Sequence, residues 1–129
     1  MSMEDDIKQC EARINQLIEG GELVDDNGYP TDSALEIIRI WHWSKPKELF
    51  EFIKSIWWQP DWGWTEGLEH VEDAATDKYR YNISTGGWSG NESIIHALQS
   101  NIMIWSIYWY QSRRGGHYIF QLREINEKE

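Results

Sequence analysis

Two glycine pairs set the strongest limits on how this chain can fold. Gly86-Gly87 lies between an alternating run at residues 79–83 and an apolar run at residues 94–98 that has helical spacing. Gly115-Gly116 joins two further runs and predicts a tight hairpin, because glycine adopts the backbone angles that such turns need. Residues 79–122 therefore predict a strand, a glycine loop, a helix and a hairpin. If the strands share a sheet, the two glycine loops can lie near each other.

The segments that flank these glycines carry more specific predictions. Ser89 and Glu92 stand three residues apart, the spacing of a capping box at the start of a helix. The run from Ile102 to Gln111 alternates with apolar side chains on both faces, which is typical of a central strand. We expect His117 to Leu122 to pair with that strand across the second glycine turn.

The N-terminal half predicts three helices from apolar side chains at spacings of three and four, at residues 4–19, 32–41 and 45–58. Gly20-Gly21 ends the first of them. Thr31 or Asp32 can cap the second, and Ser44 is the expected cap of the third.

The elements together predict an α+β fold, in which N-terminal helices pack on a small, mostly antiparallel sheet with one inserted helix. At 129 residues and 40% hydrophobic content, the chain can bury a core. We expect residues 1–129 to form a single domain, with a mainly helical part at 1–58, a strand-helix-hairpin part at 78–123 and a frayed tail at 124–129.

The net charge of −10 is distributed unevenly along the chain. Residues 1–77 carry 18 acidic and 6 basic side chains, whereas residues 78–123 carry five basic side chains and one acidic. The overall charge argues against direct nucleic-acid binding, which depends on a positive surface. It leaves open a small-anion site in the second half, a basic protein partner for the first half, or an acidic surface that only keeps the protein soluble.

Other sequence features concern location and metal binding. No apolar run approaches the roughly 20 residues needed to span a bilayer, and the acidic N-terminus is unlike a signal peptide, so we expect a cytoplasmic protein. The single cysteine, Cys10, fits a reducing compartment. Carboxylates and His70 between Glu66 and Asp77 match no metal-ligand pattern. We therefore expect a solvated acidic loop there, and no metal or cofactor.

Four of the nine tryptophans lie within residues 57–64. Indoles provide flat surfaces on which a base or sugar can stack, so this segment can form a pocket wall. Packing in the interior is the competing interpretation, because a chain with only 3 Phe needs tryptophan to fill space. A combined role stays open.

The two glycine loops hold the candidate ligand site. Glycines before a helix let backbone amides point at an anion, and arginine binds a phosphate or carboxylate in bidentate geometry. The candidate ligand-binding residues are Thr85, Gly86, Gly87, Trp88, Arg113, Arg114 and His117. The loops lack the complete phosphate-loop fingerprints, so a purely structural turn and a soluble hairpin tip are the alternatives. We predict no catalytic residues.

Three segments, residues 57–64, 83–92 and 111–120, resemble a family of small phage- and prophage-encoded proteins of unassigned function. Their sequences here are WWQPDWGW, ISTGGWSGNE and QSRRGGHYIF. The resemblance covers roughly residues 29–122. It implies an origin in a virus of bacteria and action inside the host cell, and it supplies no catalytic residues.

Two classes of function follow from these features. In the first, a phage-type accessory protein binds an anionic small molecule, such as a nucleotide, at the two glycine loops. In the second, the acidic surface of residues 1–77 engages a host protein, such as an enzyme of nucleic-acid handling or defence, as a modulator or inhibitor. An enzymatic function ranks third, because His117 and Glu92 suit proton transfer but no nucleophile has an evident base.

Overall fold

The computed structural model describes residues 2–71 and 75–122, and the tail expected at 124–129 lies outside them. The elements are, in chain order, α1 (Met3–Glu19), α2 (Asp32–Ile40), α3 (Pro46–Ile56), α4 (Pro60–Gly63), β1 (Trp64–Glu69), β2 (Lys78–Ser84), α5 (Ser89–Ser100), α6 (Ile102–Tyr108), β3 (Trp109–Arg113) and β4 (His117–Gln121).

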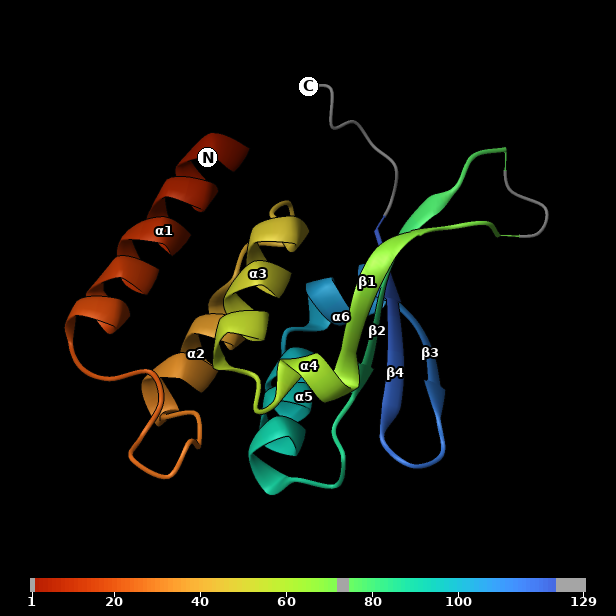
Figure 1. The fold of residues 1–129 in the computed structure, drawn as a ribbon. Coiled ribbons are helices and arrows are strands. Elements are labelled where there is room, and N and C mark those ends of the chain that lie inside the picture. The colour runs from red at the N-terminus through yellow and green to blue at the C-terminus, as the bar shows by residue number, and fades with distance from the viewer. Residues whose placement is uncertain (1, 72–74, 123–129) are drawn as a thin grey trace.

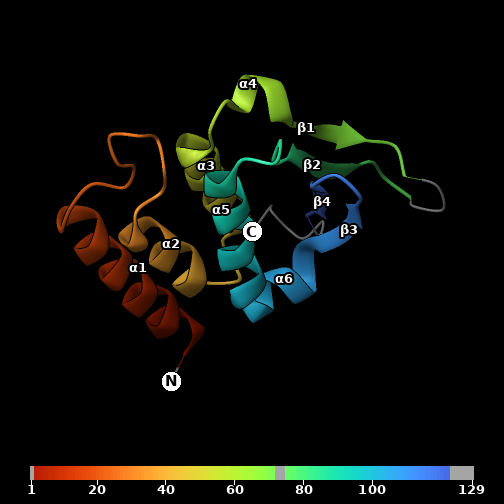
Figure 2. The same ribbon diagram turned by 90° about the horizontal axis from the view of Figure 1, so that it is seen from below.

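The four described strands form one antiparallel sheet in the order β1-β2-β4-β3 (Figure 1). β2 lies in the interior of the sheet, where Ile83 pairs with Trp64 of β1 and with Tyr118 of β4. The N-terminal helices lie to one side of this sheet, as Figures 1 and 2 show. The predicted α+β fold is therefore confirmed.

The helices cover one face of the sheet and leave the other face without a helical layer (Figure 2). Phe50 of α3 stacks on Tyr81 of β2 with ring centroids 4.3 Å apart, and it lies 5.1 Å from the ring of Phe120 in β4. Residues of α2, α3, α5, α6 and the inner sheet face share one buried cluster. This burial supplies the main driving force for folding.

The N-terminal helices begin close to the predicted residues. Thr31, one of the two predicted caps, caps α2 by accepting the amide of Ala34, and Asp32 is the first helical residue. The predicted cap of α3 is wrong, because Lys45 is the N-cap and makes no side-chain bond there. Pro46 starts the helix with the backbone angle that it needs, and the Ser44 hydroxyl instead contacts His42 Nδ1.

The strand predicted from Ile102 to Gln111 is wrong over most of its length, because residues 102–108 form α6 and only the end belongs to β3. Asn101 caps α6, since its Oδ1 accepts the amide of Ile104. The buried side chains of α6 are Ile104 and Tyr108, four residues apart as a helix requires. Two helices, rather than one, are therefore inserted between β2 and β3.

The acidic loop predicted between Glu66 and Asp77 is also wrong in its first part, where residues 64–69 form β1. Residues 72–74 lie outside the described part of the chain. Glu66 accepts hydrogen bonds from Trp64 Nε1 at 2.8 Å and from the Tyr79 hydroxyl at 2.6 Å. Its carboxylate therefore joins β1 to β2 instead of facing solvent alone.

Asn101→Ala should lower the free energy of unfolding by about 2–3 kcal/mol, because it removes a buried cap and two buried donors. Asn101 is 7% exposed, and its Nδ2 donates to the carbonyls of Ile38 at 2.9 Å and Trp41 at 3.0 Å. Urea unfolding measures the loss. Asn15→Ala, at an exposed position of α1, is the control and should change stability by less than about 0.5 kcal/mol.

Glu66→Gln should destabilise the protein at neutral pH by an amount that shrinks as the pH falls. Burial raises the pKa of Glu66, but the hydrogen bonds from Tyr79 and Trp64 and the charge of Lys54 outweigh it and hold this pKa below its ordinary value. A carboxyl with a lowered pKa stabilises the fold above its unfolded pKa, and that stabilisation is lost as the pH falls through the folded pKa.

Urea unfolding of the wild type and the variant between pH 7 and about pH 3 checks this expectation. The same carboxylate raises the pKa of Tyr79 to about 12, chiefly through the hydrogen bond. Glu66→Gln should therefore bring this pKa down in a spectrophotometric titration. A stability difference that stays constant with pH would contradict the assigned role of the carboxylate.

Candidate functional site

The two glycine loops lie side by side at one end of the sheet, as the pairing of β2 with β4 requires. Ser84 pairs with His117 at the end of this ladder, and the next residue, Thr85, donates its amide to the carbonyl of Gly116 at 3.0 Å. A Cβ at Gly116 would clash with Thr85 Oγ1, and the φ of Gly116 is +82°. Only glycine fits this contact.

Thr85 holds the first loop in shape from a buried position. Its hydroxyl accepts the amide of Gly87 at 3.2 Å and lies 3.5 Å from Glu92 Oε2. The predicted capping box is wrong, because Trp88 is the N-cap of α5 and Ser89 is already its first helical residue. The carboxylate of Glu92 is directed to Thr85 instead of to the amide of Ser89.

Trp88 stacks against two other aromatic rings. Its ring stacks on Tyr29 with centroids 4.7 Å apart and on Trp58 with centroids 4.8 Å apart. A side chain at Gly90 would collide with the Trp88 ring, so this stack needs a glycine there. The Trp88 indole is therefore used in packing between loops, and the residue is half-buried.

Asn91 fastens the first loop to the C-terminal end of α3. Its Oδ1 accepts the amide of Trp58 at 2.9 Å, and its Nδ2 donates to the carbonyls of Trp58 at 3.2 Å and Thr85 at 3.4 Å. The side chain is only 2% exposed. An amide buried in this way is fully hydrogen-bonded and fixes the position of both segments that it joins.

A pocket of about 290 Å³ opens beside the loops on the face of the sheet that the helices leave uncovered. We call it the sheet pocket. It is lined by Trp62, Gly63, Trp64, Thr65, Asn82, Ile83, Ser84, Arg113, His117, Tyr118 and Ile119. Its described lining contains no aspartate or glutamate, although the protein carries 22 of them.

The polar side chains of the sheet pocket come from neighbouring strands. Ser84 Oγ contacts His117 Nδ1, which leaves Nε2 for another partner. When Ser84 donates this bond, the proton of the neutral imidazole is on Nε2. Arg113 is exposed and donates from Nη2 to Gln111 Oε1 at 3.3 Å, with no ion pair to any described residue.

Trp62 provides an aromatic wall for the sheet pocket. One part of the ring covers Gly86, where an added Cβ would lie 2.9 Å from Cζ3 of the indole. Even so, the residue is 67% exposed, the most exposed tryptophan that the structure describes. Gly86, with a φ of +67°, thus provides the flat support on which this indole rests.

The only other described arginine that points from this face of the sheet already has its partners. Arg80 is paired with Glu69 at 3.6 Å, donates from Nε to Gln121 at 2.8 Å and lies 4.2 Å from the centre of the Tyr110 ring. Its side chain is 13% exposed. Arg113 is therefore the arginine of this face that is available to a ligand.

The structure divides the predicted ligand residues into two groups. Arg113 and His117 line the sheet pocket. Five other predicted residues do not line it, namely Thr85, Gly86, Gly87, Trp88 and Arg114. Thr85 and the glycines shape the loops, Trp88 is stacked, and Arg114 lies exposed at the hairpin tip.

Trp62 belongs to the tryptophan segment that the sequence analysis interpreted as a pocket wall or as interior packing, and it lines this pocket. Sequence reasoning missed the polar residues that complete the pocket, chiefly Thr65, Asn82 and Ser84. The alternation of polar and apolar residues along the strands is a sequence signal for Thr65, Asn82 and Ser84, and the strand register shows where they meet. Thr65 pairs with Asn82 across β1 and β2, and Ser84 pairs with His117 across β2 and β4. Polar residues that alternate with apolar ones in these strands belong to the uncovered face.

Comparisons of this chain with protein-family models, with curated proteins and with solved structures found no match. No helix in the described ranges is long and apolar enough to cross a bilayer. The same residues contain no group of three or more His, Cys, Asp or Glu side chains placed to hold a metal ion.

Gly116→Ala should destabilise the protein more than Gly87→Ala, and this difference tests the contact between the loops. Both substitutions place alanine at a positive φ, which costs about 1–2 kcal/mol. Nothing lies within 4 Å of a Cβ at Gly87, whereas at Gly116 it meets Thr85. Thermal and urea unfolding of the two variants measure the extra loss. Equal losses would show that the loops do not make this contact.

Proposed function

We propose that this protein binds a small organic anion with a flat ring, of the size of a mononucleotide, in the sheet pocket. The observation that carries the proposal is the electrostatic contrast at this site. The protein has a net charge of −10, yet the described residues that line this pocket include one arginine, one histidine and no carboxylate. Such a local reversal of charge favours an anion over a cation.

Different pocket residues can bind the charged part and the flat part of such a ligand. The guanidinium of Arg113 offers a bidentate pair of donors to a phosphate or carboxylate, and His117 Nε2 offers a further donor. Trp62 offers an exposed indole on which a ring can stack. Thr65 and Ser84 supply hydroxyl groups along the strands, and Asn82 supplies its Oδ1, since its Nδ2 already donates to Glu69 Oε2 at 2.7 Å.

The volume of the pocket limits the ligand. About 290 Å³ lies just below the range of about 300–1,000 Å³ that is usual for small-molecule sites. The size favours one nucleotide or a smaller aromatic anion over a dinucleotide cofactor. Ser84 and His117 resemble the first two members of a nucleophile–base–acid arrangement, but in the described residues no carboxylate bonds to His117. We therefore propose binding and not catalysis.

The resemblance to phage- and prophage-encoded proteins gives this binding function a setting. We propose an accessory protein that acts in the bacterial host cytoplasm, where it sequesters a signalling nucleotide or a similar metabolite. The glycine loops then contribute indirectly, because they hold the hairpin tip and Trp62 at the edges of the pocket.

Thermal unfolding in the presence of nucleotides, cyclic nucleotides, sugar phosphates, aromatic carboxylates and simple anions tests the proposal. A ligand that binds only the folded state stabilises it by about 2.7 kcal/mol at a hundredfold excess over the dissociation constant. Arg113→Ala should weaken binding of the selected ligand about tenfold or more, since a hydrogen bond to a charged group is worth about 1.5–3 kcal/mol.

Two matched variants serve as controls for this measurement. Arg114→Ala removes the neighbouring arginine, which does not line the pocket, and should leave affinity within about twofold at moderate salt. Trp62→Leu should weaken the binding of ligands that contain a ring but not the binding of simple anions. Trp43→Leu, at a partly exposed indole elsewhere, should change neither affinity. A panel without any shift, or equal losses for Arg113→Ala and Arg114→Ala, would overturn the proposal.

A further inference from the structure

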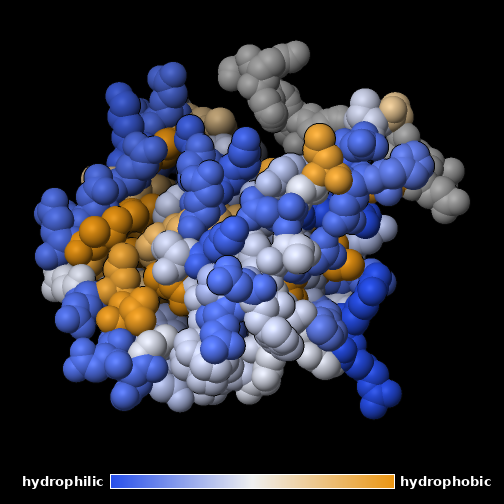
Figure 3. Space-filling view, in the orientation of Figure 1, coloured by the Kyte–Doolittle hydropathy of each residue, from blue (hydrophilic) through white to orange (hydrophobic). Residues whose placement is uncertain are grey.

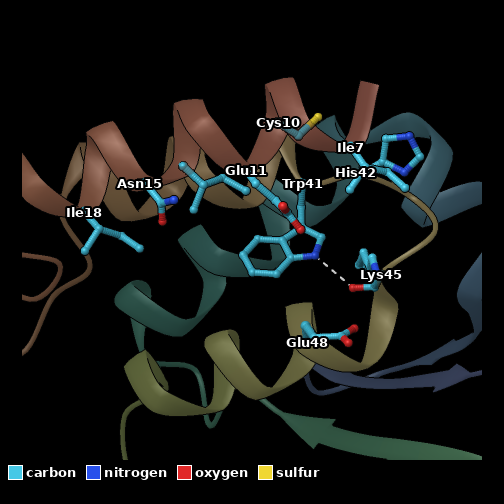
Figure 4. A pocket seen from close by; sticks show the side chains of 10 residues that line it. Ile7, Cys10, Glu11, Asn15, Ile18, Trp41, His42, Lys45 and Glu48 are labelled. Atoms are coloured by element: carbon cyan, nitrogen blue, oxygen red, sulfur yellow. Dashed lines mark hydrogen bonds between the residues drawn. The ribbon is translucent and has the colours of Figure 1, made fainter. Parts of the chain in front are cut away.

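A second hollow lies far from the sheet pocket, between α1 and the segment that leads from α2 into α3 (Figure 4). We call it the α1–α3 groove, and its volume is about 370 Å³. One wall is a stripe of α1 formed by Ile7, Cys10, Glu11, Ile14, Asn15 and Ile18. These positions repeat at three and four residues, so they lie along one face of the helix.

The apolar part of this stripe is only partly covered by the rest of the molecule. Ile14 is the one buried residue of α1, and Ile18 at the end of the stripe is 42% exposed. Figure 3 shows apolar surface beside the C-terminal part of α1, with hydrophilic side chains around it. Stable monomers usually bury the apolar face of a helix. A stripe in which Ile7 and Cys10 stay partly exposed and Ile18 is exposed therefore indicates an interaction site.

The opposite wall is rigid. Trp41 stacks on Phe52 with centroids 5.7 Å apart, and its Nε1 donates to the carbonyl of Lys45 at 2.8 Å, the bond drawn in Figure 4. The indole therefore forms a fixed apolar surface that faces the α1 stripe. An occupant between the two walls would contact apolar side chains on both sides.

The charges at the edges of the groove indicate which kind of occupant fits. Glu11 of α1 and Glu48 of α3 lie on opposite walls, both exposed and without an ion pair in the described part of the chain. α1 as a whole carries five carboxylates and two cations. Lys45 is the one lysine or arginine in the described lining. An apolar floor between acidic edges is complementary to an apolar stripe flanked by basic side chains.

We propose that the α1–α3 groove binds a basic amphipathic helix of a partner protein. The six lining residues of α1 span 11 residue steps, about 16 Å of helix, which matches three turns of a partner helix laid along them. A second copy of this chain fits less well, because two molecules of charge −10 repel each other. The groove is thus a specific site at which the acidic residues 1–77 can engage a protein partner.

The single cysteine reports directly on the groove. Cys10 is partly exposed and lines the α1 wall, so an occupant would shield its thiol from alkylation. The probe is a helical peptide of leucine and lysine, with leucine at positions i, i+3, i+4 and i+7 and lysine elsewhere. A peptide of the same composition with the leucines scattered around the helix is the first control, and a leucine–glutamate peptide is the second.

We expect the patterned leucine–lysine peptide to slow alkylation of Cys10 by iodoacetamide about tenfold or more at saturation, and the two control peptides to leave the rate unchanged. Glu11→Lys combined with Glu48→Lys should weaken binding of the patterned leucine–lysine peptide about tenfold or more, because both edges of the groove then repel it. The matched control is Glu19→Lys with Glu51→Lys, which changes one glutamate of each of the same helices outside the groove. Circular dichroism and thermal unfolding confirm that both variants fold.

Three results would overturn the proposal. Equal protection of Cys10 by the scattered peptide would show that the peptides bind by charge and not by the apolar stripe. Equal losses of peptide affinity in the two double variants would show attraction to the overall charge alone. Protection of Cys10 that rises with protein concentration in the absence of peptide, together with a dimer in sedimentation, would assign the groove to contacts between copies of this chain.

Discussion

The pairing of β2 with β4, which runs as far as the two glycine loops, is the constraint on which the candidate site depends. Because the ladder ends at Ser84 and His117, the residues adjoining these two strand ends are brought into contact, and the amide of Thr85 donates to the carbonyl of Gly116. The hairpin tip is thereby held beside the first loop. Arg113 and His117 reach the sheet pocket because this contact fixes where the hairpin ends.

Tryptophan serves different purposes on the two faces of the sheet. Trp57 and Trp64 fill the buried side, where their rings meet edge to face at 5.6 Å. Trp88 is stacked on Tyr29 and Trp58 and joins three loops. Trp62 alone of this group leaves most of its ring uncovered, which is why it, and not the predicted Trp88, suits the recognition of a ring.

Sequence reasoning found what depends on local pattern and missed what depends on distant contacts. The helices at α1 and α2, the strand at β2 and the glycine hairpin follow from spacing and turn residues. α6 did not, because its alternating apolar residues suit either structure. Asn101 decides in favour of a helix, with a side chain bonded to carbonyls some 60 positions earlier in the chain.

The candidate site shows the same division. Arg113 and His117 were predicted from the chemistry of the hairpin, and both line the pocket. Trp62 was named only as part of a tryptophan segment, and Ser84 was missed, because their roles require the corner formed by α4 and β1 to lie against the end of β2. The capping box at Ser89 failed because Trp88 is the N-cap and Ser89 is already helical, while Glu92 is directed to Thr85.

The attachment of α1 has a consequence for how this protein can change during evolution. This helix contributes one residue, Ile14, to the buried interior, and the sheet pocket lies at the other side of the fold. Substitutions along most of α1 therefore leave the sheet and its pocket intact. A lineage can alter the surface that α1 presents at little cost in folding, while selection on the pocket proceeds independently.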